Sequence, residues 1–292
     1  MKRVAVLGLG RMGAGIAARL IATGHQVVLW NRSAAKAEPL VARGAQWAAT
    51  PAAAATGAEL VIAMVADDPA SRAVWLGPDG ALGGMSPGAF AIECSTLTRG
   101  LILELDRQAR AKVLRFIDCP VTGRPDAAAA GKLTLLVGAE PADLAAARPV
   151  LESFSETIRH FGPAGAGTAY KLMINLMGAV QIAALGEGLV MAERLGLDRV
   201  AVVEAIETSA AASRQVVFHA RRMAERRFSD PTFTAELRHK DAAYGVALAR
   251  EVGACVPLGE TSVAWFDAAN RLDPAGDEGR VIDAIEAKKA RS

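Results

Sequence analysis

The first strand and the turn after it constrain the fold of this chain more than any other part of the sequence. Val4–Leu7 is an unbroken apolar run, which is typical of a buried strand, and residues 8–13 match the pattern GxGxxG. Apolar side chains then recur at helical spacing at Met12, Ile16 and Leu20. A strand, a glycine-rich turn and a helix in this order predict the first unit of a doubly wound, mostly parallel α/β sheet.

The glycines of this turn predict a phosphate-binding site. Gly8 permits the tight turn, Gly10 lets the backbone approach a pyrophosphate, and Gly13 lets the helix pack close to the strand. The free N–H groups and the positive dipole end at the start of the helix also favour phosphates. The alternative is a glycine-rich turn that binds no ligand. The dinucleotide contacts that we predict here are Gly8, Leu9, Gly10, Arg11, Met12 and Gly13.

The residues after the second predicted strand, Val27–Trp30, indicate which dinucleotide binds. An NAD enzyme usually places an acidic residue here for the ribose 2′-hydroxyl, whereas this chain has Asn31, Arg32 and Ser33, with Lys36 one turn later. Neutral and cationic groups suit a 2′-phosphate, because arginine can hydrogen-bond it and aspartate would repel it. The sequence therefore predicts NADP(H) in preference to NAD(H). The alternative is a solvated arginine and lysine at the start of a surface helix.

Short apolar runs separated by helical stretches continue to about residue 160. Leu60–Val65, Ala89–Ile92, Phe116–Cys119 and Leu133–Val137 have the pattern of further strands. Strands that alternate with helices predict a mostly parallel sheet with right-handed crossovers and helices on both faces.

The pattern changes at the glycine-rich break 162–167. One long helical pattern runs from Thr168 to about Leu195, and no convincing strand follows it. With 292 residues, about twice the length of one typical domain, we predict a dinucleotide-binding domain at 1–162 and an all-helical substrate and oligomerisation domain at 163–292. Further helices are expected around 199–212, 213–227, 234–252, 257–271 and 278–290.

The composition excludes several classes of protein. Apolar residues make up 52% of the chain and charged residues 22%, so the chain can bury a core and is not disordered. The formal net charge is only +2, so we expect neither nucleic acid nor an anionic membrane as a partner. The helical stretch 172–186 is apolar nearly all round, which predicts a homodimer or homotetramer that covers it.

Cysteine usage and the N-terminal residues predict a cytoplasmic location. Cys94, Cys119 and Cys255 form no CxxC pair, and the four histidines show no metal-ligand spacing, so we expect neither a disulfide framework nor a metal. The N-terminus passes directly into Val4–Leu7 without a signal-peptide core. The uncharged stretch 172–186 is shorter than the ~20 apolar residues that a membrane span needs.

Four motifs in order resemble the β-hydroxyacid dehydrogenase family, which includes 3-hydroxyisobutyrate dehydrogenase, tartronate semialdehyde reductase and the glyoxylate/succinic semialdehyde reductases. The resemblance extends over nearly the whole chain. It implies a Rossmann-type domain followed by an all-helical domain, and hydride transfer between a nicotinamide and a small β-hydroxyacid, semialdehyde or 2-oxoacid. The motifs are the turn at 8–13, Asp118-Cys119-Pro120-Val121-Thr122-Gly123, Gly165-Ala166-Gly167 followed by Lys171 and Asn175, and Lys240-Asp241.

The resemblance also implies further contacts. Ser95-Thr96 stands where the family contacts the nicotinamide half of the cofactor, Thr122 and Gly123 anchor the substrate carboxylate, and Lys240 closes over cofactor and substrate. The alternative for Thr122 and Gly123 is an ordinary turn, which would use the same residue types, and the alternative for Lys240 is a solvated lysine paired with Glu236. The remaining cofactor contacts implied are Val65, Ala66, Thr96 and Lys240, and the implied substrate contacts are Thr122, Gly123, Arg124, Lys171, Asn175 and Lys240.

Lys171 and Asn175 are the predicted catalytic residues. They are spaced i, i+4 on the long helix, so both side chains leave the same face. A lysine on an apolar helix face needs a partner or a lowered pKa, and a lysine tuned in this way can exchange a proton near neutral pH. Lys171 would then protonate the substrate oxygen while Asn175 orients the lysine or binds that oxygen. The alternative is a lysine whose amine reaches solvent at the helix start.

Two residues depart from the family pattern and leave the substrate open. Arg124 stands where a second glycine is usual, and it either binds a substrate carboxylate or narrows the pocket, or it points to solvent. Tyr244 replaces an aliphatic residue and either lines the pocket or packs in the core.

Two other functions compete with this interpretation. An imine reductase shares the architecture but usually has Asp or Tyr at the position of Lys171, and a non-catalytic dinucleotide-binding module would not need the lysine. The presence of Lys171 argues against both.

Overall fold

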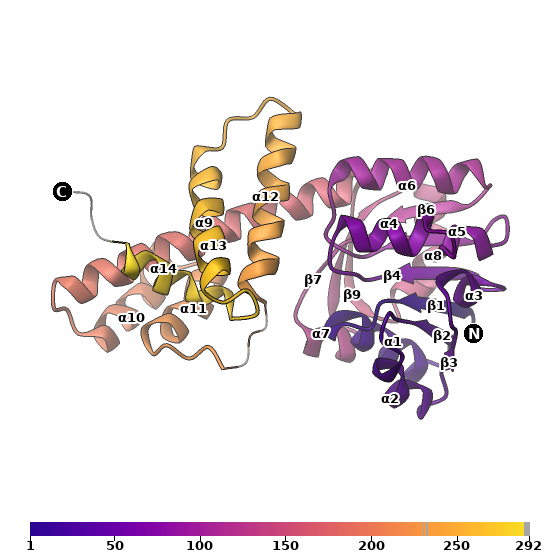
Figure 1. The fold of residues 1–292 in the computed structure, drawn as a ribbon, viewed down its shortest axis with the longest axis horizontal. Helices are drawn as coiled ribbons and strands as arrows, with labels where there is room; N and C mark the ends of the chain where they lie inside the picture. Colours follow the sequence, from indigo (N-terminus) through magenta and orange to yellow (C-terminus); the bar gives the residue numbers. More distant parts are fainter. Residues whose placement is uncertain (230, 232, 289–292) are drawn as a thin grey trace. The chain divides into compact units, whose positions relative to one another are not determined.

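The computed structural model describes residues 1–229, 231 and 233–288 of the chain (Figure 1). These residues form two compact units, one of Met1–Lys171 and one from Leu172 onward. The division falls inside helix α9 (Ala166–Arg194), further along the chain than the domain boundary that we predicted after residue 162.

The first unit is built on one β-sheet. The strand order is β3-β2-β1-β4-β5-β6-β8-β7, and β9 pairs with β8. Strands β1 to β6 pair in parallel, whereas β8 runs antiparallel to β6 and β7, so the predicted mostly parallel sheet is confirmed. The strands are β1 (Arg3–Leu7), β2 (Gln26–Trp30), β3 (Gln46–Trp47), β4 (Leu60–Ala63), β5 (Phe90–Glu93), β6 (Arg115–Asp118), β7 (Val121–Thr122), β8 (Leu133–Gly138) and β9 (Ser155–Gly162).

Helices cover both faces of this sheet because successive strand side chains point to opposite faces. In β1, Val4 and Val6 belong to one buried cluster, and Ala5 and Leu7 belong to the other. Each fully buried valine or leucine side chain contributes about 1.5–3 kcal/mol. The first cluster packs under α1 (Arg11–Ala22), α2 (Glu38–Val41), α7 (Pro125–Ala130) and α8 (Pro141–Leu151), and the second packs under α3 (Pro51–Ala55), α4 (Asp68–Leu76), α5 (Ala81–Gly84) and α6 (Arg99–Ala111) (Figure 1).

The second unit is helical in the part of the chain that the structure describes. Its core includes Ile182 of α9 together with Val203, Met223, Phe266 and Ile282 from the other helices. Residues 289 and 290 of the helix predicted at 278–290 lie outside the described residues. The elements after α9 are α10 (Arg199–Thr208), α11 (Arg214–Ala224), α12 (Ala235–Glu251), α13 (Pro257–Leu272), the short 3-10 helix η2 (Glu278–Arg280) and α14 (Val281–Ala287).

Local hydrogen bonds explain why two helices are shorter than predicted. Helix α10 ends at Thr208 because Ser209 has an extended backbone, not at residue 212 as predicted. Ser213 lies before α11, where its hydroxyl accepts a hydrogen bond from the Val216 N–H and caps the helix. Serine competes with the helix backbone in this way, so it favours helix ends over helix interiors.

Helix α9 is longer and more apolar than the stretch 172–186 on which the sequence argument depended. By length and composition alone it could cross a membrane. Core helices of soluble proteins pass the same test, and here Ala179 and Ile182 are fully buried in the core of the second unit. The length of the apolar stretch therefore does not decide whether this helix could span a membrane.

The start of α9 packs so closely against β8 that it requires glycine. A Cβ atom on Gly167 would lie 2.2 Å from the Leu136 carbonyl oxygen, and one on Gly138 would lie 2.6 Å from the Pro163 carbonyl oxygen. Gly188, further along the same helix, would meet nothing within 4 Å.

We expect Gly167→Ala and Gly188→Ala to change stability in opposite directions. The first inserts a methyl group into a packed contact and should lower the free energy of unfolding by about 1–3 kcal/mol. The second should raise it by about 0.4–1 kcal/mol because alanine restricts the unfolded chain. Thermal denaturation followed by circular dichroism measures both, and equal melting temperatures for the two variants would contradict the close packing.

Candidate active site

The parallel sheet brings the predicted cofactor residues to one edge. The carboxyl ends of β1, β2, β4, β5 and β6 lie side by side, since these strands pair in parallel register. The glycine-rich turn follows β1, Asn31 follows β2, and Val65 and Thr96 lie just beyond β4 and β5. Ligands of doubly wound folds bind at this edge.

The three glycines of the first turn differ in what surrounds them. Gly8 has φ +96°, and its Cβ atom would lie 2.2 Å from the Met64 carbonyl oxygen. A Cβ atom on Gly13 would lie 2.0 Å from the Gly8 carbonyl oxygen, whereas one on Gly10 would meet nothing within 4 Å. Packing therefore requires Gly8 and Gly13, and the bare backbone of Gly10 faces open space at the start of α1. No side chain caps α1, so the turn fits a phosphate group.

Asn31 holds the glycine-rich turn in place. Its Oδ1 atom accepts a hydrogen bond from the Leu9 N–H at 2.9 Å, and its Nδ2 atom donates to the Ser33 carbonyl oxygen at 2.9 Å. Our sequence argument considered only a ribose contact for Asn31 and missed this structural role. Arg32 and Lys36 are exposed beside the carboxyl end of β2, with the 3-10 helix η1 (Ala34–Ala37) beginning after Ser33.

Ser95 and Glu93 form a buried support beneath the neighbouring turns. The Ser95 hydroxyl accepts a hydrogen bond from the Val65 N–H at 2.8 Å, and the Ser95 N–H donates to Glu93 Oε1 at 2.8 Å. Glu93 Oε2 also accepts from the Ser71 hydroxyl at 2.6 Å and from Trp75 Nε1 at 2.8 Å. Burial raises the pKa of the Glu93 carboxyl although these hydrogen bonds oppose the shift. The sequence analysis did not single out Glu93.

Asp118 at the end of β6 fastens the first turn of α9 to the sheet. Its Oδ2 atom accepts from the Gly165 N–H at 3.0 Å and the Thr168 N–H at 2.9 Å, and Oδ1 lies 2.5 Å from the Thr168 hydroxyl. Complete burial raises the pKa of Asp118 to about 7, the charge of Glu93 adds to the shift, and the hydrogen bonds oppose it. Lys171 follows Thr168 by one helical turn and is half-buried. The second and third family motifs are thus joined by direct hydrogen bonds.

The predicted substrate anchor lies on β7 and the turn after it. Thr122 pairs with Thr134 of β8, and Gly123 has φ +136°, a conformation that a side chain would strain. Arg124 precedes α7, and its Nε atom lies 3.8 Å from Asp126 Oδ1 in an exposed ion pair. The carboxylate-binding role of Arg124 stays a prediction.

In the second unit, Asp241 joins two predicted site residues. Asn175 Nδ2 donates to Asp241 Oδ2 at 2.6 Å, and Lys240 Nζ lies 2.8 Å from Asp241 Oδ1. Lys240 Nζ also lies 5.0 Å from the centre of the Tyr244 ring. Lys240 is thus paired with Asp241. Asp241 belongs to a motif that the sequence analysis quoted, but its role as the link was missed.

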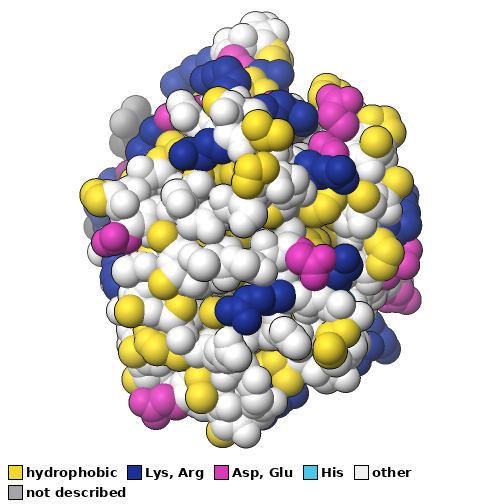
Figure 2. Space-filling view, turned by 90° about the vertical axis from the view of Figure 1, so that its right-hand side faces the viewer, with side chains coloured by type: hydrophobic (Ala, Val, Ile, Leu, Met, Phe, Trp, Pro, Cys, Tyr) yellow, Lys and Arg dark blue, Asp and Glu magenta, His cyan; other side chains and the backbone are white. Residues whose placement is uncertain are grey.

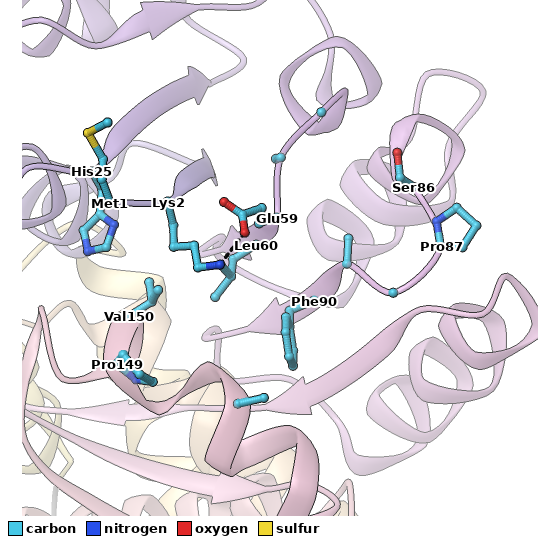
Figure 3. A pocket seen from close by; sticks show the side chains of 15 residues that line it. Met1, Lys2, His25, Glu59, Leu60, Ser86, Pro87, Phe90, Pro149 and Val150 are labelled. Carbon is cyan, nitrogen blue, oxygen red and sulfur yellow. Dashed lines mark hydrogen bonds and ion pairs between the residues drawn. The ribbon is translucent and has the colours of Figure 1, made fainter.

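A cavity of about 550 Å³ lies at the opposite edge of the sheet, by the amino ends of β1, β4 and β5 (Figure 3). Lys2, His25, Glu59 and Phe90 are among its lining residues, and Lys2 Nζ lies 2.5 Å from Glu59 Oε2. None of the predicted site residues lines this cavity. On the face shown in Figure 2, charged side chains of both signs are scattered among apolar ones.

Comparisons with known proteins identify family models and relatives that match nearly the whole chain. Residues 3–162 match the family model of the NAD binding domain of 6-phosphogluconate dehydrogenase, and residues 165–285 match that for NAD-binding of NADP-dependent 3-hydroxyisobutyrate dehydrogenase. An uncharacterized oxidoreductase of Bacillus subtilis is 34% identical over 91% of this chain and 93% of its own. The 3-hydroxyisobutyrate dehydrogenase of Pseudomonas aeruginosa is 31% identical over 98% of each chain.

A solved structure shows the same fold. The 3-hydroxyisobutyrate dehydrogenase of Mycobacterium tuberculosis with L-serine has a TM-score of 0.90 to this chain at 30% identity. The match covers 98% of this chain and 100% of that one.

We expect Asp118→Asn to flatten the pH dependence of stability. The folded-state pKa of about 7 lies above the ordinary value of 3.8, so the stability contributed by the neutral carboxyl is complete below the ordinary value and is lost as pH rises through about 7. The amide stays neutral and keeps one oxygen acceptor for the two backbone N–H groups. The variant should therefore match the wild type at about pH 4, lie increasingly above it in melting temperature as the pH rises, and exceed it most at about pH 8.

Asp118→Ala is the matched control for the hydrogen bonds. It leaves two backbone N–H groups and the Thr168 hydroxyl without their acceptor, so it should be about 1–3 kcal/mol less stable than Asp118→Asn at both pH values. A melting curve of Asp118→Asn with the same pH slope as the wild type would contradict the charge argument.

Proposed function

The chain belongs to the β-hydroxyacid dehydrogenase family of NAD(P)-dependent oxidoreductases, and on that premise we propose that it transfers hydride between NADP(H) and a small β-hydroxyacid, semialdehyde or 2-oxoacid. One observation carries the proposal. Asp118 fixes the start of α9 to the carboxyl edge of the sheet. Lys171, three residues after Thr168, is therefore held near the same edge as the glycine-rich turn of residues 8–13.

Residues 8–13 would hold the pyrophosphate of the cofactor. Gly10 offers an unobstructed backbone, and the uncapped N–H groups of α1 offer hydrogen-bond donors to an anion. Val65, Ala66 and Thr96, on the neighbouring turns, would line the nicotinamide half. The bound nicotinamide supplies or takes up the hydride.

Arg32, Ser33 and Lys36 would select NADP(H). They are exposed at the carboxyl end of β2, and no acidic side chain stands among residues 31–36 to repel a 2′-phosphate. A guanidinium can donate two hydrogen bonds to one phosphate, which favours Arg32 as the main contact.

Lys171 would act as the general acid and base. Its Nζ atom would donate a proton to the substrate carbonyl oxygen during reduction and take the hydroxyl proton during oxidation. Asn175, one turn later on α9, would hold that oxygen or the lysine, and its amide is itself oriented by Asp241. Lys240, on the same carboxylate, would contact cofactor and substrate.

A small carboxylate-bearing molecule is the substrate class that we propose. The relatives described above include a 3-hydroxyisobutyrate dehydrogenase and a structure of such an enzyme with L-serine, and both molecules are small hydroxyacids. Thr122 supplies a hydroxyl and Gly123 a backbone N–H, which together suit a carboxylate. Arg124 would approach that carboxylate or restrict the size of its substituent.

We also propose a homodimer or homotetramer in the cytoplasm. Met173, Met177 and Met191 of α9 are about half exposed or more, which favours a second copy of the chain over solvent as their neighbour.

Lys171→Ala should lower kcat/KM for the preferred substrate by on the order of 10²-fold or more, because the proton donor to the oxygen is lost. Oxidation of NADPH is followed with glyoxylate, succinic semialdehyde, methylmalonate semialdehyde, tartronate semialdehyde and a cyclic imine. The exposed Lys132 provides the control Lys132→Ala, which should keep full activity. Near-normal turnover by Lys171→Ala, or reduction of the imine alone by the wild type, would contradict the proposal.

Arg32→Ala should shift cofactor preference toward NAD(H). Loss of a charge-assisted contact to the 2′-phosphate predicts a rise in the Kd for NADPH of roughly tenfold to a hundredfold, with little change for NADH. Fluorescence titration measures both constants. Lys112→Ala, an exposed lysine that follows α6 at the other edge of the sheet, is the control. An equal rise in the Kd values for NADPH and NADH would show that Arg32 does not contact the 2′-phosphate.

A further inference from the structure

We propose that Arg238 and Glu278 act as positioning residues that hold the backbone of Asn175 in place for the reaction. The inference rests on the proposed function, because it concerns the turn of α9 that carries the predicted catalytic amide. All three residues belong to the second unit.

The Arg238 guanidinium joins two elements that are distant in sequence. It lies on α12 and is 5% exposed. Its Nη1 atom donates a hydrogen bond to the Asn175 carbonyl oxygen at 3.1 Å, and its Nε atom donates to Glu278 Oε2 at 2.5 Å. The guanidinium carbon also lies 4.8 Å from the centre of the Phe233 ring. These contacts fix its position from three sides.

Helix α9 provides room for the guanidinium through a glycine. A Cβ atom on Gly178 would lie 3.3 Å from Arg238 Nη1 and 3.0 Å from Gln215 Nε2. Gly178 follows Asn175 by three residues, so both lie on one face of the helix. The missing side chain lets the guanidinium reach the carbonyl of Asn175.

Glu278 stays ionised and keeps the arginine in one orientation. Burial acts to raise the pKa of this carboxyl, but the charge of Arg238 and the contacts with His219 and Arg238 outweigh it and lower the pKa to about 2. The His219 Nε2 atom lies 3.3 Å from Glu278 Oε1 on the other side of the carboxylate. The ion pair with Arg238 therefore persists at every pH at which the enzyme would work.

Two residues of helix α12 hold the side chain and the backbone of Asn175. Asp241, one turn after Arg238 on α12, accepts from the side-chain Nδ2 atom, while Arg238 donates to the backbone carbonyl. A buried ion pair is a poor source of stability compared with apolar side chains of the same size. What this pair supplies is a fixed location for the amide, and a shift of about 1 Å at a reacting group can lower a rate a hundredfold.

The test replaces both partners at once. Arg238→Met/Glu278→Met removes the anchor without leaving a lone buried charge, so the protein should stay folded, with a melting temperature near that of the wild type. We expect kcat to fall roughly tenfold to a hundredfold and the Kd for NADPH, measured by fluorescence, to stay unchanged. The control is Arg222→Met/Asp277→Asn, which breaks another ion pair of the same unit, between a partly exposed arginine and a buried aspartate, and should leave kcat within about twofold.

A double-mutant cycle with Asn175→Ala separates this inference from the proposed function. If Arg238 acts through Asn175, the Arg238→Met/Glu278→Met change should lower kcat little further in the Asn175→Ala background. Independent, multiplying losses would overturn the inference, as would full activity of Arg238→Met/Glu278→Met beside an impaired Asn175→Ala. Full activity of Asn175→Ala would instead overturn the role proposed for the amide itself.

Gly178→Ala covers the case in which the ion-pair variant does not fold. The added methyl group would require Gln215 Nε2 and Arg238 Nη1 to shift slightly from the helix but suits a helix backbone, so a fall in kcat with an unchanged melting temperature is expected. Gly188→Ala in the same helix should leave kcat unchanged. Equal kcat values for the two glycine variants would overturn the inference.

Discussion

The buried carboxyl of Asp118 is the contact on which the predicted catalytic helix depends. Backbone N–H groups at the start of a helix need acceptors, and here the acceptor comes from the end of β6, not from a residue beside the helix. The helix therefore begins at a place set by the sheet, and Lys171 comes one turn later. The arrangement puts an anion-favouring helix end against a fully buried carboxyl, and burial is the stronger of the two effects because it raises the pKa to about 7.

Close backbone contacts explain why glycine recurs around the predicted site, and they separate structural glycines from a ligand glycine. Gly8, Gly13 and Gly167 each face a carbonyl oxygen that a side chain would strike. Gly10 faces nothing, although it belongs to the same motif as Gly8 and Gly13. Gly10 stands at the start of α1, which no side chain caps, so its open surroundings leave room for the phosphate that we propose there. The cavity at the amino edge, by contrast, has its charged pair already satisfied internally.

The sequence predicted the elements well where one local pattern decides them. The run Val4–Leu7, the turn after it and the break near residue 162 placed the first strand, the glycine-rich turn and the long helix, and the family resemblance supplied the candidate site residues in order along the chain. The supports beneath the site depend on contacts between distant segments, such as Asn31 with Leu9, Ser95 with Val65 and Asp241 with Asn175. Each is a polar residue after a strand or on a helix, and nothing in its local pattern tells a ligand contact from an internal hydrogen bond. Helix ends near Ser209 and Ser213 were missed for a related reason, since a serine caps or continues a helix according to its backbone conformation.

In the second unit, too, contacts between distant segments hold a predicted site residue, and there the contacts involve charged side chains. Its buried ion pairs add little to the free energy of unfolding, because arginine and carboxylate must each be removed from water before they can pair. Yet Arg238, Glu278 and Asp241 all lead by hydrogen bonds or ion pairs to one residue, Asn175, through both its backbone and its side chain. Apolar side chains of the same size would pack the helices equally well, but they would supply neither the acceptor for the Asn175 side-chain amide nor the donor for its carbonyl oxygen. Convergence of the costly groups on a single amide is expected when the location of that amide matters more than the stability of the helices around it.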